Sequence, residues 1–367
     1  MHVLLIAFRN LFGEKGRFII TVGGVVFSVI LILILLGLYQ GWQLQMSRFL
    51  NTIPVDLWVG QKGSRDTVHS ISLLPRTLED NLAAIEGASN VAPFVGRQIS
   101  FELNGKDAHI FLLGMGENNG IKPYKMVAGE SSLENNEVII DMIFARSENL
   151  SVGDTISVNG VDLKITGISS GGNLLVYSYA FAPLETVRKI LESDQITNYY
   201  LIQSSNAQLA KVQLGTRFPN LEITEHQKFV ENNTGIIKQT FLPIIGILVV
   251  IALAIGILVI GLTIFTATIE KSKEYGVLKA VGYTSLQLFW IAFIQACIAG
   301  IIGFIAGVFL AEIIATIGTR FVGGFIVDIG IKEILSVFFI TLLMSAVASF
   351  IPLRRIISID PAQVFKA

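Results

Sequence analysis

Residues 18–38 read FIITVGGVVFSVILILILLGL, a run with no Asp, Glu, Lys or Arg. A helix of about 20 apolar residues crosses the roughly 30 Å hydrocarbon core of a bilayer. The charge-free run continues to Ser47, and three later stretches are also free of charge and long enough to span. We therefore predict four transmembrane helices, at residues 18–47, 239–269, 286–311 and 334–353.

The composition of the whole chain agrees with a membrane protein. Of its 367 residues, 52% are apolar and only 15% are charged, whereas about a quarter of residues are charged in a soluble globular domain. The formal net charge of -1 provides no overall field that would attract nucleic acid. Because Cys297 is the single cysteine, an intrachain disulfide and a cysteine metal cluster are excluded.

The first apolar run has two interpretations. Basic residues precede it, as they precede a secretory signal peptide, but its apolar core is longer than the roughly 7 to 15 residues usual for one. No Ala-x-Ala-like cleavage site follows the run. These two features favour a retained transmembrane helix.

Basic residues in the short flanks set the predicted orientation, because such residues stay in the cytoplasm. We predict a multi-pass protein of the cytoplasmic (inner) membrane with both termini cytoplasmic: an amphipathic helix at 1–17, a loop at 270–285 and a tail at 354–367. Residues 48–238 and a short link at 312–333 are then outside. The basic residues concerned are Arg9, Lys15, Arg17, Lys271, Lys273, Lys279, Arg354, Arg355 and Lys366.

The predicted spans carry no ionisable side chain near their centres, and Gln295 and Glu312 are the nearest polar candidates. Proton- or ion-coupled carriers usually hold such groups at mid-membrane, so this class of transporter is disfavoured. Small-residue pairs at Gly37/Gly41 and Gly303/Gly307 allow close helix approach. The contact they make is either within one chain or between two copies in a dimer.

Residues 48–238 are expected to form a folded α+β domain, with two β-hairpins. Asn104-Gly105 and Asn159-Gly160 each separate two β-prone segments. Asn-Gly is typical of a tight hairpin turn, since both of its central residues need positive φ. We expect this α+β domain to consist of one or two subdomains.

Short helical patterns complete the domain, at Leu78 to Ile85, Met142 to Asn149, Leu184 to Leu191 and Ala207 to Phe218. The segment from Thr224 to Lys238 predicts a polar helix that runs into the second span, with Pro243 as the first strong breaker. A helical stalk of this kind transmits displacement, whereas a flexible linker does not.

Several common chemistries lack their motifs. The pair Gly105-Lys106 continues into Asp107, so it is no phosphate-binding P-loop, and Gly-x-Ser-x-Gly is absent. The four histidines lack metal-ligand spacing. Glu130, Glu134 and Glu137 lack the ligand run of an EF-hand, and a solvated loop is the favoured interpretation. We therefore predict no catalytic, cofactor or metal residues in this chain, and no enzyme activity of its own.

Residues 269–282 read IEKSKEYGVLKAVG and join the second and third spans. The charges alternate in sign, while Tyr275, Val277, Leu278 and Val281 offer an apolar face. One interpretation is a helix that lies on lipid headgroups, which the mixed charge disfavours. The other is a short helix that docks into a soluble protein.

This loop resembles the segment between the second and third helices of ABC transporter permeases of the MacB, FtsX and LolC/LolE type, the mechanotransmission or type VII family. That family has approximately Glu-Arg-x-x-Glu-Ile-Gly-x-Leu-Arg-Ala-x-Gly-Ala. Here Lys replaces Arg twice, Tyr275 stands for Ile and Tyr283 for Ala. The matching positions are Glu270, Lys271, Glu274, Gly276, Leu278, Lys279, Ala280 and Gly282.

The resemblance extends along the chain. The DevC-like order of helices, the tail Ile359 to Ala362, and the segments Asn136 to Ile140 and Leu150 to Thr155 are also similar to the family. The resemblance implies an ATPase-coupling interface formed by Glu270, Lys271, Lys273, Glu274, Tyr275, Gly276, Val277, Leu278, Lys279, Ala280 and Gly282.

The resemblance further implies a homodimer, or a pseudo-symmetric heterodimer, in the lipid bilayer with two copies of a cytoplasmic ATP-binding cassette ATPase. ATP and Mg would bind that partner and not this chain. An envelope adaptor or an outer-membrane partner is compatible with the family. Nucleic acid is not an expected partner.

Two functions then stand as hypotheses. The first is a permease subunit of an ATP-driven exporter that extrudes or extracts an amphipathic or hydrophobic compound, such as a lipid, haem, a peptide or a lipoprotein. The second is an FtsX-like signal transmitter that controls an envelope hydrolase or a sensor without transport. Tyr39 and Trp42, at the predicted outer mouth, are the tentative substrate-proximal residues.

Overall fold

The computed structural model describes residues 2–67, 71–174, 177–321 and 325–358. The chain divides into two compact units, each with its own packing. The first unit comprises Met1–Gln40, Phe241–Arg320 and Ile326–Ala367, and the second comprises Gly41–Thr240 and Phe321–Phe325. The similar tail at Ile359 to Ala362 lies outside the described residues.

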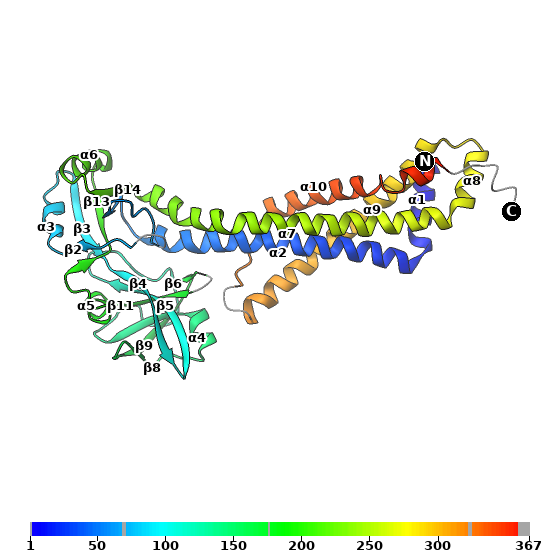
Figure 1. Cartoon of the computed structure of the whole chain (residues 1–367). Coiled ribbons are helices and arrows are strands. Elements are labelled where there is room, and N and C mark those ends of the chain that lie inside the picture. Colours follow the sequence, from blue (N-terminus) through cyan, green and yellow to red (C-terminus); the bar gives the residue numbers. More distant parts are fainter. Residues whose placement is uncertain (1, 68–70, 175–176, 322–324, 359–367) are drawn as a thin grey trace. The chain divides into compact units, whose positions relative to one another are not determined.

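Among the described residues, four helices are long and apolar enough to cross a membrane, which confirms the predicted plan of four membrane helices (Figure 1). Three shorter helices accompany them: α1 (His2–Gly13), α8 (Ser272–Ala280) and α11 (Leu353–Ile357). The four long helices are α2 (Lys15–Thr52), α7 (His226–Glu270), α9 (Ser285–Phe321) and α10 (Ile331–Ala348).

Two helix ends differ from the predicted spans. Helix α9 continues to Phe321, so the predicted link at 312–333 is helical in its first part. Charged residues such as Glu312 mark where a bilayer ends, but they are good helix formers and do not end a helix. Helix α10 ends at Ala348 instead of continuing to residue 353, because Pro352 has no N–H to donate to Ala348.

In the first unit, glycines bring the long helices together. A Cβ on Gly303 or Gly307 of α9 would lie 2.6 to 2.7 Å from Val25 or Val29 of α2. Real Cβ atoms do not approach so closely, so only glycine fits. Gly303 and Gly307 therefore make their close helix contact within one chain, which was one of the two predicted alternatives.

The other helix pairs of the first unit use the same device. A Cβ on Gly24 of α2 would meet Val259 of α7 at 2.4 Å, and a Cβ on Gly256 would meet Met344 of α10 at 2.2 Å. Ser28 donates a hydrogen bond of 2.9 Å to the carbonyl of Ala252, which ties α2 to α7 directly. The four helices thus share one core.

The second unit contains two principal sheets, and each carries its own helices. The first is antiparallel, in the order β14-β1-β13-β3. Helices α3 (Leu78–Ala83) and α6 (Ala207–Arg217) pack on it. Its strands are β14 (Leu221–Glu225), β1 (Leu57–Gln61), β13 (Tyr199–Ser204) and β3 (Ala88–Phe94).

The second sheet is mixed, in the order β4-β5-β11-β7-β9-β6, with β8 and β10 at its margins. Helices α4 (Met142–Ser147) and α5 (Leu184–Ile190) pack on it. Its strands are β4 (Gly96–Leu103), β5 (Lys106–Met115), β11 (Tyr177–Pro183), β7 (Glu137–Asp141), β9 (Val161–Ser170), β6 (Lys125–Gly129), β8 (Thr155–Val158) and β10 (Asn173–Leu174). A two-stranded pair, β12 (Ile196–Thr197) and β2 (Leu74–Pro75), completes the unit.

Both predicted hairpins are confirmed. Strands β4 and β5 pair antiparallel up to Leu103 opposite Lys106, and β8 and β9 pair up to Val158 opposite Val161. The turn residues have positive φ, at 53° and 77° for Asn104 and Gly105 and at 49° and 78° for Asn159 and Gly160. The four predicted short helices also form, as α3, α4, α5 and α6.

An aromatic cluster in the second unit joins the end of α2 and the start of α7 to both sheets. Trp58 of β1 stacks on Phe229 of α7 with ring centroids 4.0 Å apart. Phe49 of α2 contacts Tyr179 of β11 at 4.3 Å. The predicted polar helix forms from His226 onward, because α7 begins there and passes through Pro243 without ending. Thr224, where the prediction began, lies in β14.

Arg188 of α5 provides a stability test for the second unit. Its side chain is only 1% exposed, and it donates to the carbonyls of Ser193 and Ile196 at 3.2 and 2.9 Å. We expect Arg188→Leu to destabilise the second unit by about 3 kcal/mol, because both carbonyls lose their buried donor. Thermal unfolding of the full chain measures this, with the exposed neighbour Lys189→Leu as the control. Equal melting temperatures for the two variants would contradict the prediction.

Candidate functional site

The connection between α7 and α9 is a structured loop. Helix α7 ends at Glu270 and α8 begins at Ser272, so Lys271 alone separates them. The amide of Lys271 donates to the carbonyl of Ala267, and the amide of Tyr275 donates to that of Lys271, both at 3.0 Å. The i to i−4 ladder thus passes through the break, and α8 is tied to the end of α7 through the backbone.

The end of α8 explains why the loop needs a glycine at 282. Gly282 has a φ of 106°, which favours glycine. The amide of Tyr283 donates to Leu278 at 2.9 Å, and the amide of Gly282 donates to Lys279 at 3.0 Å. These two bonds form a Schellman motif, which satisfies the last carbonyls of the helix. Beyond it, the Thr284 amide and the Gln287 side chain bond at 2.9 Å and cap the start of α9.

One face of α8 packs against its own chain. Tyr275 is 3% exposed and belongs to the core of the first unit, and Leu278 packs against the same core. Gly276 is also buried. Burial raises the pKa of Tyr275 to about 12, although a hydrogen bond with the Asn10 side chain acts in the opposite direction.

The opposite face of α8 is exposed. Val277 is 46% exposed and Val281 is 75% exposed. Their spacing of four places them on the same side of a helix, together with the exposed Lys273, Glu274 and Ala280. We call these five residues the free face of α8. Neither Lys273 nor Glu274 forms an ion pair with another described residue.

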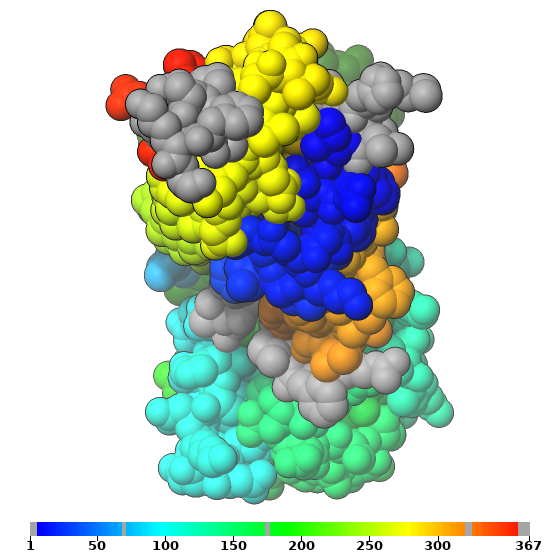
Figure 2. Space-filling view, turned by 90° about the vertical axis from the view of Figure 1, so that its right-hand side faces the viewer, coloured from blue at the N-terminus to red at the C-terminus, as the bar shows by residue number. Residues whose placement is uncertain are grey.

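The segment around the start of α2 packs against this loop. Arg17 bonds to Glu270 at 2.7 Å and also pairs with Glu14. Lys271 lies 3.4 Å from Glu14, and its Nζ donates to the Asn10 side chain at 3.0 Å. Figure 2 shows the blue surface of α1 and the start of α2 directly against the yellow surface of the loop.

A groove of about 640 Å³ opens beside these contacts. Val277 and Glu274 of the free face form one part of it. Arg9, Gly13 and Ile6 belong to its other wall, on α1. The arrangement presents a mixed apolar and charged surface of a kind that suits a protein partner.

Comparison with known protein families gives the site its context. Residues 18–214, more than half of the chain, match the family described as MacB-like periplasmic core domain. Residues 246–361 match the family described as FtsX-like permease C-terminal. The chain belongs to the MacB/FtsX-type ABC transporter permeases.

Relatives of this permease cover nearly its whole length. An uncharacterized ABC transporter permease of Mycobacterium tuberculosis (strain H37Rv) is 22% identical, over 99% of both chains. HrtB of Staphylococcus epidermidis (strain ATCC 12228), named for hemin transport, is 24% identical over 98% of both chains. The macrolide export ATP-binding/permease protein MacB of Escherichia coli is 22% identical, over 95% of this chain and 58% of its own.

The structure of the permease places the predicted coupling residues together but on different sides of α8. Lys273, Glu274, Val277 and Ala280 are exposed, whereas Tyr275 and Gly276 face the interior of their own unit. Of the predicted apolar face, Val277 and Val281 are therefore accessible, and Tyr275 and Leu278 pack inward. The side chain of Lys279 donates to the carbonyl of Ile357 at 3.1 Å. The role of this set as a coupling interface stays a prediction.

Tyr39 and Trp42 lie on α2 and are both half-buried. Tyr39 belongs to the first unit, 22 positions along the same helix from Arg17, which corresponds to about 33 Å. Trp42 belongs to the second unit. Their proposed contact with substrate stays a prediction.

The sequence pattern did not indicate the contribution of Asn10 and Glu14 to the permease's loop region. Both residues lie before the first span, where the basic residues alone indicate orientation. A signal was present, since Glu14 and Lys271 are opposite charges at the ends of consecutive membrane helices. Such complementarity becomes informative only when the two helices are known to be neighbours.

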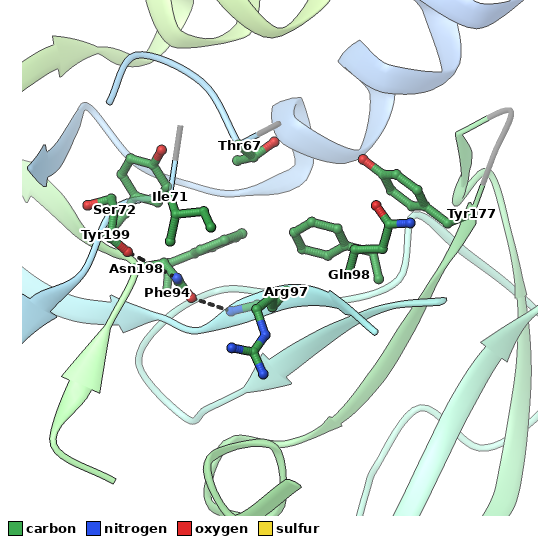
Figure 3. A pocket seen from close by; sticks show the side chains of 11 residues that line it. Thr67, Ile71, Ser72, Phe94, Arg97, Gln98, Tyr177, Asn198 and Tyr199 are labelled. Atoms are coloured by element: carbon green, nitrogen blue, oxygen red, sulfur yellow. Dashed lines mark hydrogen bonds between the residues drawn. The ribbon is translucent and has the colours of Figure 1, made fainter. Parts of the chain in front are cut away.

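The second unit of the permease contains a cleft of about 290 Å³ between strands of its two sheets (Figure 3). Phe94, Phe111, Tyr177 and Tyr199 supply aromatic side chains to its lining. The side-chain oxygen of Asn198, labelled in Figure 3, accepts a hydrogen bond of 2.9 Å from the amide of Gly96. This bond holds strand β4 against the segment that precedes β13.

No set of described residues in the permease could hold a metal ion through three or more His, Cys, Asp or Glu side chains. The acidic group at Glu130, Glu134 and Glu137 lines an open groove. Within it, the Glu137 carboxylate accepts a 2.7 Å hydrogen bond from the Glu134 amide. This local bond agrees with the favoured interpretation of a solvated loop.

Proposed function

We propose that this permease is the membrane subunit of an ATP-driven exporter and that a separate cytoplasmic ATPase docks on the free face of α8. The observation that carries the proposal is the exposure of Lys273, Glu274, Val277 and Val281 on one side of a helix whose other side is buried. Two charges of opposite sign beside two exposed valines form a specific surface for a soluble partner.

The energy source follows from what the sequence lacks. The chain has no P-loop motif and no ionisable group at mid-span, so neither ATP hydrolysis nor ion coupling has residues to act through. The name of the E. coli relative combines ATP-binding and permease. Because the P-loop motif is missing here, the proposal assigns ATP and Mg to a partner chain. In the assembly, two ATPases serve a homodimer of this permease.

Movement passes from the loop through helices. The backbone ladder joins α8 to α7, and α7 is a continuous helix from Glu270 back to His226. At its start, Phe229 is fixed by stacking on Trp58 in the second unit. Closure of the ATPases on α8 then moves α7, with the termini and α8 in the cytoplasm and the second unit outside.

The transported compound is proposed to be amphipathic or hydrophobic. The spans carry no central charge that would favour a small ion or a polar solute. The names of two relatives mention hemin transport and macrolide export, and both compounds combine a large apolar frame with a few polar groups. A lipid, a peptide or a lipoprotein shares this character.

Charge reversal on the free face tests the docking. We expect Glu274→Lys to weaken capture of the partner ATP-binding cassette ATPase about tenfold, because it places like charges in the contact. Val281→Asp should act similarly by burying an unpaired carboxylate. Co-purification from membranes at graded partner concentration measures both. The matched control is Glu102→Lys, the same replacement on an exposed position of β4. Wild-type capture by both free-face variants would overturn the docking proposal.

A measurement of substrate flux distinguishes the exporter from the signal transmitter. An exporter should move hemin or a fluorescent lipid across proteoliposomes when ATP and the partner are present. ATP-dependent capture of an outside protein without any flux would instead favour the FtsX-like signal transmitter.

A further inference from the structure

We propose that four charged residues, Glu14, Arg17, Glu270 and Lys271, couple α8 to α2, so that the ATPase moves α2 and α7 together. We call them the charge cluster. This inference rests on the proposed function, because it concerns how a displacement of α8 enters the membrane helices. It assigns positioning roles to Glu14 and Arg17, which lie outside the loop itself.

The cluster lies where two helix pairs are interrupted. Glu14 is the single residue between α1 and α2, and Lys271 is the single residue between α7 and α8. These two residues face each other at 3.4 Å. Arg17, the third residue of α2, reaches Glu270, the last residue of α7, at 2.7 Å. Each of the two helix interruptions therefore carries a charged residue that forms an ion pair with a residue at the other interruption.

The burial of the cluster makes these pairs stronger than ordinary surface ion pairs. The side chain of Lys271 is 17% exposed and that of Arg17 is 22% exposed, although Glu270 is 62% exposed. Solvent screens partly buried pairs less than exposed ones. Loss of one partner also leaves the other charge uncompensated in a poorly hydrated site. The cluster can thus transmit a displacement that a surface pair would not.

Asn10 and Tyr275 extend the connection to α8 itself. The Asn10 side chain accepts from Lys271 at 3.0 Å, and Tyr275 of α8 belongs to the same buried core as Ala7 of α1. Because Tyr275 is buried on the inner face of α8, a partner pressing on the free face acts on α1 and α2 through it. The contact does not depend on the backbone of α7.

Above the cluster, α2 and α7 are packed for common movement. Gly24 contacts Val259, and the hydroxyl of Ser28 donates to the carbonyl of Ala252. With the cluster at one end and these contacts along their length, the two helices move as a pair. Without the cluster, α8 acts on α7 alone, and α2 can lag behind.

The experiment reverses charges and then restores the pairs. We expect Arg17→Glu to retain ATPase capture within about twofold of wild type but to reduce nucleotide-driven movement about tenfold. The quadruple variant E14K/R17E/E270R/K271E reverses every charge while it keeps each opposite-sign pair and the net charge of both flanks. It should recover movement to within about twofold of wild type.

Movement is measured in the assembled complex with the ATPase in lipid nanodiscs. Ser205→Cys, at an exposed position of the second unit, carries a spin label on a Cys297→Ser background. The distance between the labels of the two copies is compared with and without ATP and vanadate. The control is Lys15→Glu, which makes the same charge change near Arg17 at an exposed position. The Lys15→Glu variant should show the same ATP-dependent change in label distance as the wild type.

The outcomes separate this inference from the docking proposal. If the ATP-dependent change in label distance is the same in Arg17→Glu as in Lys15→Glu, the inference is wrong. It is also wrong if the quadruple variant inserts and captures the ATPase but shows no such change. If the quadruple variant fails to insert, the same distance change is compared between Arg17→Gln and Lys15→Gln. Equal changes in these two variants would overturn the inference. Wild-type capture by both Glu274→Lys and Val281→Asp would overturn the docking surface and leave the cluster standing. A wild-type complex that forms but shows no nucleotide-driven movement would overturn the inference and leave the docking surface standing.

Discussion

Gly303→Leu should destabilise the membrane bundle by about 3 kcal/mol, because a side chain at this position has no room. Even the Cβ would lie 2.6 Å from the Cβ and Cγ1 of Val25 and 3.3 Å from the carbonyl of Val22. Helices α2 and α9 must therefore separate, and the contact of Gly307 with Val29 one turn away opens with them. Titration with SDS in mixed micelles, followed by circular dichroism, measures the loss.

The control for Gly303 lies on α2. Nothing lies within 4 Å of the position of a Cβ on Gly23, which is exposed. Gly23→Leu should stabilise the helix by up to about 1 kcal/mol, since it replaces a poor helix former by a good one. The two substitutions thus have opposite expected signs. A destabilisation of similar size in both would show that close packing at Gly303 is not the cause.

Local signals in the sequence predicted much of the fold. Asn104-Gly105 and Asn159-Gly160 specify their turns because few residue pairs tolerate two consecutive positive φ values. The four membrane helices follow from length and apolarity alone. Helix ends were less accessible, since α9 passes Glu312 and continues to Phe321. A bilayer boundary depends on side-chain polarity, whereas a helix ends through backbone signals.

The candidate site was only partly predictable, because the sides of α8 are decided by tertiary packing. Tyr275 and Val277 look equivalent as apolar residues in the sequence, yet one is buried and the other exposed. What separates them is the presence of Asn10 and the core of the first unit beside Tyr275. The motif located the loop, and only the neighbouring helices decide which of its residues a partner can reach.

Gly276→Pro should abolish docking of the ATPase while the chain still inserts in the membrane. Gly276 is the fifth of the nine residues of α8. Proline there removes an amide donor and clashes with the preceding turn, at a cost of about 3 kcal/mol or more. A nine-residue helix has little stability of its own, so α8 unfolds and the free face loses its shape. Capture of the ATPase should then fall about a hundredfold.

Gly276→Ala distinguishes loss of the helix from loss of space at this buried position. Alanine keeps the amide donor and favours the helix by up to about 1 kcal/mol, so capture should stay near that of wild type. Size-exclusion profiles and membrane yield check that both variants insert. If alanine is as harmful as proline, the need at 276 is for space and not for the helix. If proline leaves capture intact, a folded α8 is not what the ATPase recognises, and the docking surface lies elsewhere on the chain.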